Sequence, residues 1–425
     1  MTEMKDSGTT WLGMIPKDWE LSKISSIYEL RTQKVSDKDY PPLSVTMNGI
    51  VPQLDSAAKT NAHDDRKLVK KGDFAINSRS DRRGSCGVSE YDGSVSLINT
   101  VMKPRDEMNP NYYNWLFHTI QFADEFYKWG HGIVDDLWTT NWQDMKHIDI
   151  PVPTLDEQKV IADYLNKAIP EIDALHTDIE KQIETLEEYK KSIITEAVTK
   201  GLNPDVEMKD SGIEWIGMIP KHWNVMRTKY ASENLSKGNG ITKDEIKNDG
   251  NIQCIRYGEI YSKYDGSILK CFSKTKKELI SSPKYISKGD ILFAGTGELV
   301  EEIGKNVVYM GDGDCLAGGD IIVMKHNQNP VFFNYALNST YSQAQKSKGK
   351  AKLKVVHISA ADIGNIFVAI PPKKEQKKIA IILEKKCFEI NCAINEKKEQ
   401  LDTLEQYKKS LIYKYVTGKK EVLND

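Results

Sequence analysis

The sequence lacks the features that mark membrane proteins and disulfide-bonded proteins. No apolar run is long enough to span a membrane, and the first residues mix polar, acidic and basic side chains, unlike a signal peptide. The six cysteines include no Cys-x-x-Cys pair, which favours reduced thiols over a disulfide frame. Together with a mean hydropathy of −0.51, these absences predict a cytoplasmic protein with no membrane partner.

An excess of one charge is also absent. The formal net charge is −2, although 28% of the residues are charged. A nearly neutral chain is not expected to bind nucleic acids or membrane surfaces indiscriminately. A local basic groove is still compatible with this balance, because DNA responds to local phosphate contacts and not to the net charge.

Motifs for catalysis are missing as well. There is no GxxxxGK[ST] phosphate loop, and the GTG turn at 295–297 lacks the third glycine of a dinucleotide-binding loop. The NPNY segment at 109–112 lacks the second proline of the motif with which methylases act on DNA bases. The eight histidines show no metal-ligand spacing. We predict that the chain binds no metal and is not itself an enzyme.

What the sequence does contain is a duplicated frame. The repeated segments are MKDSG (4–8 and 208–212), GMIPK (13–17 and 217–221), the tryptophans Trp11/Trp215 and Trp19/Trp223, and LEEYKKS or LEQYKKS (186–192 and 404–410). Each head, from the first tryptophan to the second, is expected to be a structured connector packed by its tryptophans. The inserts, roughly 20–149 and 224–369, resemble each other little. One frame around two different inserts suggests one scaffold that presents two different reading domains.

Both inserts alternate short strand-like runs with a helix. Each also carries a Lys-Gly-Asp turn directly before a strand, at 71–73 and 288–290. We therefore predict two related, mixed α/β domains. The expected strands lie at 74–76, 95–98 and 148–150 in the first insert and at 252–255, 290–293 and 320–324 in the second, and the expected helices lie at 112–129 and 331–345.

Prolines mark the end of each insert, in IPVP at 150–153 and in IPP at 370–372. A long helix is expected to follow each of them. The chain is thus divided into four segments. They are a head with the first insert domain (1–153), a first spacer helix (154–200), a linker and head with the second insert domain (201–370), and a second spacer helix with a tail (371–425).

Both long helices carry apolar residues at a seven-residue spacing, and the two series are in register with each other. This spacing predicts a coiled-coil seam; the alternative is that each helix packs only on its own domain. Leu175 is expected on the seam side, Pro170 should kink or break the first helix, and Lys397 interrupts the second series. The predicted seam comprises Leu165, Ile172, Ile179, Ile183, Leu186, Ile193, Leu383, Ile390, Ile394, Leu401, Leu404 and Leu411.

The two repeats should be related by an approximate two-fold axis. Under this symmetry the helices run antiparallel, with one insert domain at each end. The first helix ends in VTKG (198–201), which leads into the second head, and the second helix ends in VTG (416–418). The N-terminal head has no helix before it, so we expect it to lie close to the C-terminal helix end.

One loop of the first insert has the composition of a DNA-reading loop. Segment 77–85 combines three arginines with small polar residues. Arginine suits guanine edges and phosphates, asparagine suits adenine, and serine and glycine allow close approach of the backbone. The alternative is a solvated loop in which Asp81 neutralises an arginine. The candidate DNA contacts are Asn77, Ser78, Arg79, Ser80, Arg82 and Arg83.

Further candidates are a glycine turn around His131 and two segments of the second insert. The turn can bring backbone amides to phosphates. One segment of the second insert combines a cation with aromatic residues, and another is a run of alternating lysines that suits phosphate contact. The alternative is an ordinary solvated lysine run. These candidates are His131, Arg256, Tyr257, Tyr261, Lys346, Lys348 and Lys350.

As an ordered set, these segments resemble the specificity subunit of type I restriction–modification enzymes over nearly the whole chain. The matching pieces are the heads MKDSG..W.GMIPK.W, the turns beginning KGDFAIN and KGDILFA, the segment GIVDDLWTTNWQDMKHIDIPVP, and the helices beginning DEQKVIADYL and KEQKKIAIIL. No single piece would be specific, but their order is.

The resemblance implies two target-recognition domains, held apart by two antiparallel helices, each reading one half of a split, asymmetric sequence in double-stranded DNA. It also implies two kinds of partner: modification (methyltransferase) subunits and restriction (translocase/endonuclease) subunits. S-adenosylmethionine, ATP and Mg are then expected on the partners and not on this chain. The alternative function is a non-catalytic repeat adaptor that binds proteins rather than DNA.

Overall fold

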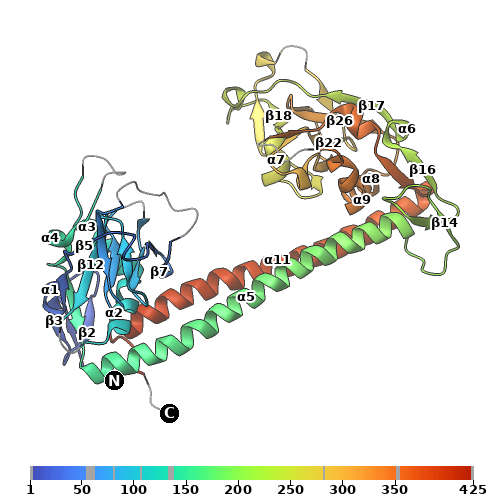
Figure 1. The fold of residues 1–425 in the computed structure, drawn as a ribbon. Coiled ribbons are helices and arrows are strands. Elements are labelled where there is room, and N and C mark those ends of the chain that lie inside the picture. The colour runs from blue at the N-terminus through green and yellow to red at the C-terminus, as the bar shows by residue number, and fades with distance from the viewer. Residues whose placement is uncertain are drawn as a thin grey trace. The chain divides into compact units, whose positions relative to one another are not determined.

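The computed structural model describes most of the chain. The described residues are 3–53, 63–79, 82–105, 108–132, 138–280, 283–350 and 355–422. They form two compact units, Met1–Glu180 with Lys398–Asp425 (unit 1) and Lys181–Lys397 (unit 2). Unit 1 thus combines the first insert with both ends of the chain, and unit 2 contains the second insert (Figure 1).

Each unit contains one head, and the two heads form the same hairpin. The paired strands are β1 (Met4–Asp6) with β2 (Met14–Pro16), and β14 (Met208–Asp210) with β15 (Met218–Pro220). The register is identical, since Lys5 lies opposite Ile15 and Lys209 lies opposite Ile219. Both isoleucines are fully buried, which anchors each hairpin on its own unit.

The head tryptophans are buried with one exception. Trp11, Trp19 and Trp223 are at most 5% exposed, whereas Trp215 is 40% exposed, so the expectation of a packed Trp215 was wrong. Trp11 packs edge-on against Phe122, with ring centres 5.8 Å apart. The ring of the corresponding Trp215 has a lysine ammonium 5.6 Å from its centre.

The first insert folds into two small antiparallel sheets and short helices. The main sheet has the order β10 (Cys86–Val88), β9 (Phe74–Asn77), β12 (Asn99–Pro104), β4 (Tyr28–Leu30), and the second sheet has the order β11 (Gly93–Val95), β8 (Arg66–Val69), β5 (Lys34–Val35). The helices include α1 (Ile24–Ile27), α2 (Pro110–Phe117), α3 (Ile120–Lys128) and α4 (Trp142–Met145). Two further strand pairs are β3 (Glu20–Lys23) with β13 (Asp149–Val152), and β6 (Leu43–Thr46) with β7 (Gly49–Pro52). Successive side chains of a strand point to opposite faces. Phe74 and Ile76 therefore pack with the residues of α2 and α3, whereas Ala75 packs with the second sheet.

Among the described residues, the second insert repeats this layout with one more strand in each of the two sheets. That sheet has the order β17 (Ser232–Lys237), β26 (Ile321–His326), β22 (Ile291–Ala294), β24 (Asn306–Tyr309), β19 (Ser267–Ile268), and the second sheet has the order β20 (Ser273–Thr275), β18 (Ile252–Ile255), β25 (Cys315–Ala317), β21 (Tyr285–Ile286). The helices include α6 (Thr228–Ala231), α7 (Tyr257–Ser262), α8 (Pro330–Asn338), α9 (Thr340–Ser347) and α10 (Ala360–Gly364). Short 3-10 helices lie at Lys243–Glu245, Lys277–Leu279 and Val300–Glu302. Two further strand pairs are β16 (Asn224–Arg227) with β28 (Phe367–Ile370), and β23 (Thr296–Gly297) with β27 (Val356–His357). The added β19 pairs parallel with β24. Among the described residues of unit 1, no strand lies beyond the equivalent β10.

The Lys-Gly-Asp turn has the same structure in both units. Gly72 and Gly289 have φ angles of 89° and 97°, a region that glycine adopts readily and other residues do not. Asp73 and Asp290 each accept a hydrogen bond, at 2.8 Å, from the backbone N–H three residues earlier. The turn then leads into β9 in one unit and β22 in the other. The predicted mixed α/β fold of both inserts is confirmed.

Two long helices connect the segments of the chain. They are α5 (Leu155–Lys200) and α11 (Lys373–Val416). In unit 1, Tyr164 packs on Tyr415 with ring centres 4.5 Å apart, and Asp173 pairs with Lys408. Residues later in α5 thus face residues earlier in α11, so the two helices are antiparallel in this unit. Among the described residues, no helix has a stretch long and apolar enough to cross a membrane.

The predicted seam residues lie on the inner side of both helices. Six of them are at most 8% exposed, namely Leu165, Ile179, Leu383, Ile390, Ile394 and Leu411. The other six are half-buried, namely Ile172, Ile183, Leu186, Ile193, Leu401 and Leu404. Leu175 is 50% exposed, so its expected place on the seam was wrong. Ile169, which is 3% exposed, lies on the inner side instead, because it follows Leu165 by four residues.

Pro170 does not end the first helix. α5 is continuous through this residue, so the break that we considered is absent. The proline side chain is exposed, while its neighbours Ile169 and Ile172 keep their inward positions. Packing on both sides of Pro170 compensates for the backbone hydrogen bond that proline cannot donate. Lys397 is likewise accommodated within α11, half-buried.

The N-terminal head packs on the C-terminal end of α11 within unit 1. The hydroxyl of Tyr413 donates a hydrogen bond to the carbonyl of Trp11 at 2.7 Å. Gly418 lies so close to Pro16 that a Cβ atom there would come within 2.3 Å of the proline ring. These contacts confirm that the head and the end of the second helix are neighbours.

Candidate nucleic-acid interface

The arginine loop of unit 1 leaves β9 at Asn77. The side-chain carbonyl of Asn77 accepts a hydrogen bond from the backbone N–H of Arg79 at 3.0 Å, and Asn77 is only 8% exposed. Ser78 pairs with Thr100 at 3.0 Å between their hydroxyls. Asn77 and Ser78 therefore shape the loop from inside, and the expectation that Asn77 reads a base does not agree with its burial. Ser80 and Asp81 lie outside the described residues.

The three arginines of the loop differ in their surroundings. The side chains of Arg79, Arg82 and Arg83 are all exposed. Arg83 forms an ion pair with Asp124 of α3, and its guanidinium lies 5.4 Å from the centre of the Tyr127 ring. A carboxylate of α3 therefore neutralises an arginine. Arg79, whose side chain is exposed, is therefore a better candidate for contact with DNA than Arg83.

The structure brings His131 beside this loop. Thr139 forms backbone bridges both to Arg79 and to His131, so two expected contacts share one neighbour. The His131 imidazole is exposed and lies 3.4 Å from a carboxylate oxygen of Asp144. Beneath the loop, a narrow pocket has an aromatic floor that includes Phe117, Phe122, Phe126, Tyr127 and Trp138. The exposed Arg79 and His131 suit contact with phosphates, whereas Phe117, Phe122 and Phe126 of the floor are buried in the core.

In unit 2, the candidate contacts lie at the start of α7. Arg256 precedes this helix and pairs with Glu259, at 3.4 Å. Tyr257 is 39% exposed, so its ring is accessible. The hydroxyl of Tyr261 is buried and has no hydrogen-bond partner among the described residues. Tyr257 is thus a better candidate for contact with DNA than Tyr261.

The expected lysine contacts require a correction. Lys346 is 2% exposed and donates hydrogen bonds to the carbonyl oxygens of Gly304 and Asn306, at 2.7 and 2.8 Å. Burial lowers the pKa of Lys346 to about 7. A buried amine cannot bind a phosphate from this position, so the prediction for Lys346 was wrong. The helical period of α9 turns this lysine inward, which an alternating pattern cannot show.

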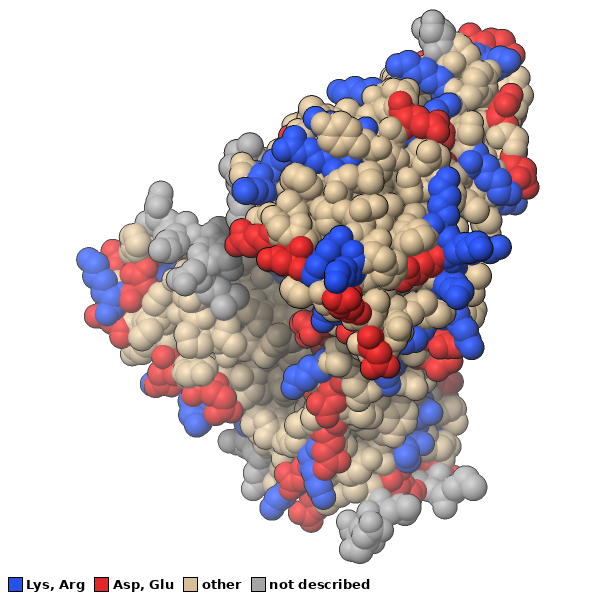
Figure 2. Space-filling view, turned by 90° about the vertical axis from the view of Figure 1, so that its right-hand side faces the viewer, with Lys and Arg blue, Asp and Glu red and all other residues tan. Residues whose placement is uncertain are grey.

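The other two lysines of the run have partners within the unit. Lys348 lies over the exposed ring of Trp215, and Lys350 pairs with Asp362 at 3.1 Å. On the face shown in Figure 2, Lys and Arg side chains are interspersed with Asp and Glu side chains. Attraction of phosphates on this face therefore depends on a few local cations and not on a broad field.

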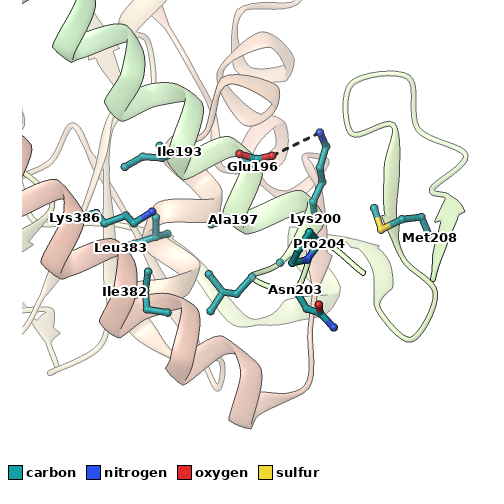
Figure 3. A pocket seen from close by; sticks show the side chains of 12 residues that line it. Ile193, Glu196, Ala197, Lys200, Asn203, Pro204, Met208, Ile382, Leu383 and Lys386 are labelled. Atoms are coloured by element: carbon teal, nitrogen blue, oxygen red, sulfur yellow. Dashed lines mark ion pairs between the residues drawn. The ribbon is translucent and has the colours of Figure 1, made fainter. Parts of the chain in front are cut away.

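A groove in unit 2 marks a further difference between the repeats (Figure 3). It is lined by Ile193, Ala197, Leu202, Met208, Ile382 and Leu383, among others. By the repeat that aligns LEEYKKS with LEQYKKS, Ala197 and Ile382 correspond to Tyr415 and Tyr164. These two rings pack on each other in unit 1 and fill the equivalent space.

Comparison with known proteins identifies the family. The model of the type I restriction modification DNA specificity domain matches the chain twice, at residues 16–185 and 220–406. The chain belongs to this family. Each match covers one insert and most of the helix after it, so the chain carries two DNA specificity domains. The reading as a protein-binding adaptor is not favoured.

Curated relatives agree with the family. The putative type I restriction enzyme MjaX specificity subunit and the MjaVIII specificity subunit, both from Methanocaldococcus jannaschii, are 26% and 24% identical to the chain. Both alignments cover 96% of this chain and 95% of the relative. The StySPI specificity subunit of Salmonella potsdam is 20% identical, over 86% of this chain and 81% of its own length.

Solved structures share the fold. A chain from a study of complex assembly and conformational transition of the type I R-M system has a TM-score of 0.73 at 14% identity, covering 95% of this chain and 99% of its own. The HsdS subunit from Thermoanaerobacter tengcongensis has a TM-score of 0.52 at 15% identity, covering 95% and 98%. At these identities the likeness concerns the fold alone.

Sequence reasoning missed several residues of the candidate interface. Asp124 and Tyr127 hold Arg83 from α3, and Thr139 joins Arg79 to His131. The spacing of Asp124 and Tyr127, three residues apart on one helix, is a weak signal for a shared face. Thr139 carries no signal in the sequence, because its role comes from backbone pairing alone.

Proposed function

We propose that the chain is the DNA-sequence specificity subunit of a type I restriction–modification complex, in which each specificity domain reads one half of a split, asymmetric target. The observation that carries the proposal is the pairing of one repeated frame with two unlike candidate surfaces. In unit 1 the surface has the exposed Arg79 bridged through Thr139 to His131, and in unit 2 it has Arg256 and Tyr257 at a helix start. Two identical surfaces would suit an inverted repeat, whereas two different ones suit two unlike half-sites.

We further propose that the chain binds and orients DNA without catalysing a reaction. Methylation of adenine and restriction would then belong to partner subunits, which would bind S-adenosylmethionine, ATP and Mg. In support, the interface residues are arginines, aromatic rings and hydroxyls, which suit binding.

The repeated helix segment is the proposed docking place for the modification subunits. Tyr189 and Tyr407 occupy equivalent positions in LEEYKKS and LEQYKKS and are 53% and 52% exposed. Packing inside the chain does not account for an exposed ring that is kept in both copies. A partner subunit that binds each copy of the segment would explain why both tyrosine rings are exposed. The repeat therefore favours two copies of one partner. The groove at Ala197 is a poorer candidate, because its equivalent in unit 1 is filled.

The proposal is tested by mapping methylated adenines in DNA from cells that express the chain with its partner subunits. We expect one split motif with two different halves. Arg79→Ala and Arg82→Ala should relax only one half, and Arg256→Ala should relax only the other. Methylation that is unchanged without the chain, or that keeps full specificity in all three variants, would refute the proposed reading surfaces.

A further inference from the structure

Two equivalent lysines of the repeated helix segment have different partners. Lys408, in LEQYKKS, pairs with Asp173 of α5. By the same repeat, Lys190 corresponds to Lys408, and Asn391 corresponds to Asp173. The carboxylate is therefore missing from the helix pair of unit 2. Lys190 finds one elsewhere, on Asp265 of the second specificity domain.

Lys190, Asn391 and Asp265 form a closed set of three hydrogen bonds. The ammonium of Lys190 donates to Asp265 at 3.0 Å and to the side-chain carbonyl of Asn391 at 2.8 Å. The side-chain amide of Asn391 donates to the same carboxylate oxygen of Asp265 at 3.1 Å. The Lys190 side chain is only 21% exposed. One carboxylate of the domain is thus held by both long helices.

Asp265 is firmly connected to the rest of its domain. It precedes Gly266, whose φ of 74° makes the turn into the added strand β19. The carbonyl of Gly266 accepts hydrogen bonds from the backbone N–H of Val308 at 2.9 Å and from the side-chain amide of Asn334 at 3.0 Å. The turn is therefore tied both to the main sheet and to α8. The strand that carries it has no counterpart among the described residues of unit 1.

The same turn also follows α7, the helix at the candidate DNA surface. Ile260 of α7 is fully buried and Tyr264, just before Asp265, is 7% exposed. Both pack in the core between the two sheets of the domain. A fixed Asp265 therefore fixes the end of α7, and through the helix it fixes Arg256 and Tyr257 at its start.

We propose that Lys190, Asn391 and Asp265 form a clasp that positions α7 on the helix pair. The clasp is peculiar to the second domain, and its function rests on the proposed reading of DNA by Arg256 and Tyr257. The apolar core joins the base of this domain to the helices around Ala197 and Ile379. On α5, Lys190 of the clasp lies about two turns before Ala197, away from that core, so the clasp resists rocking of the domain about the core.

The clasp is tested directly, without DNA, by measuring one distance within unit 2. Spin labels are placed on the exposed positions Glu187→Cys of α5 and Ser262→Cys of α7, in the full chain. Cys392→Ser removes the exposed native thiol, since the other five cysteines are buried. We expect a narrow distance distribution in this parent and a broad one in Asp265→Ala and in Lys190→Met.

Two further variants test whether Lys190 must pair with a carboxylate of the domain, or whether any carboxylate near Lys190 is sufficient. Asp173→Asn removes the equivalent carboxylate in unit 1, where no insert domain takes part, and should leave the distribution narrow. Adding Asn391→Asp to Asp265→Ala gives Lys190 a carboxylate again, but on α11, and should leave the distribution broad. A distribution that stays narrow and unshifted in Asp265→Ala, with the variant folded as judged by circular dichroism, would overturn the clasp.

The consequence for DNA is measured separately, in the methylated motif of cells carrying Asp265→Ala. We expect discrimination in the half-site read by unit 2, or of the spacing next to it, to fall roughly fivefold or less, the range for a partly exposed ion pair. The half-site read by unit 1 should not change. If the parent itself yields no split motif, the proposed function fails while the distance result still decides the clasp. A broad distance distribution with a fully unchanged motif would show that the clasp does not position α7 for reading.

Discussion

In unit 1, the indole N–H of Trp19 donates to Glu157 at 3.0 Å, and in unit 2 that of Trp223 donates to Glu375 at 3.1 Å. The next residue repeats its contacts as well. The side-chain amides of Gln158 and Gln376 each donate to a proline carbonyl at 2.9 Å, and their carbonyls accept from the backbone N–H of an asparagine at 2.9 and 2.8 Å. The two units thus share the joint between head, insert and helix atom by atom.

The inserts that these joints hold differ in the surfaces they present. After β9, unit 1 has an arginine loop bridged to Thr139, whereas after β22, unit 2 has the short strand Thr296–Gly297 paired with β27. The main sheet of unit 2 has the added β19, and its domain is clasped to the helices through Asp265. The two units therefore keep the same sequence where parts of the chain pack on one another. They differ in sequence at the surfaces that are proposed to contact different half-sites.

The largest expected effect comes from removing the repeated joint. Trp19→Ala and Trp223→Ala should each destabilise their own unit by about 3–5 kcal/mol, the usual cost of truncating a buried aromatic side chain. Hydrogen exchange of the full chain should rise only in the unit that carries the change. For Trp19→Ala this includes residues 411–418, because the end of α11 belongs to unit 1. Equal increases in hydrogen exchange in both units would show that the two units are not stabilised independently of each other.

The next expected effect is a pH dependence of the free energy of unfolding, which should be present in unit 2 and not in unit 1. Burial lowers the pKa of Lys346 to about 7, whereas an unfolded lysine titrates near 10.5. Between these values the unfolded chain binds one proton more than the folded chain. The free energy of unfolding of unit 2 should therefore rise with pH in this window, by at most about 1.4 kcal/mol per pH unit, and should be level below pH 7.

Lys346→Met provides the control for this effect, since it keeps the length of the side chain but cannot titrate. Urea unfolding of both proteins at pH 7 and pH 9, followed by exchange in each unit, gives the difference. The wild-type minus variant stability of unit 2 should increase with pH, and unit 1 should show no difference. An unchanged difference for unit 2 between the two pH values would mean that Lys346 is charged in the folded state.

The fate of Lys346 also shows how far the sequence alone could lead. The repeated segments and the seven-residue spacing predict the hairpin heads, the inserts and the long helices, because these features depend on local pattern. Lys346 has the same local pattern as Lys348, and only the packing of α9 on Asn306 makes it internal. In the same way, Trp215 repeats Trp11 in sequence, but Trp11 is 5% exposed and packs on Phe122 whereas Trp215 is 40% exposed. Residue roles that depend on the partner element could not be predicted from either copy of the frame.

Affinity for DNA should distinguish the arginines of unit 1. Arg79→Ala and Arg82→Ala should each weaken recognition of one half-site by about 1–3 kcal/mol if the side chain reads a base. Arg83→Ala should have a smaller effect than Arg79→Ala, because Asp124 already neutralises the Arg83 guanidinium. Binding of the assembled complex to targets altered in one half at a time, over a range of salt concentrations, measures this. A larger loss for Arg83→Ala than for Arg79→Ala would reverse the assignment.

The smallest expected effect concerns the groove that distinguishes the helix ends. In unit 1, the rings of Tyr164 and Tyr415 pack on each other at a tilt, and their counterparts in unit 2 are Ile382 and Ala197 beside the groove. Ala197→Tyr together with Ile382→Tyr should rebuild this aromatic pair and fill the groove. An aromatic pair contributes about 0.5–1.5 kcal/mol beyond the burial of area. In a double-mutant cycle on the stability of unit 2, the two changes should therefore be coupled favourably by that amount. Additive or unfavourable effects would show that the frame of unit 2 has adapted to the groove, and that the two helix ends are no longer interchangeable.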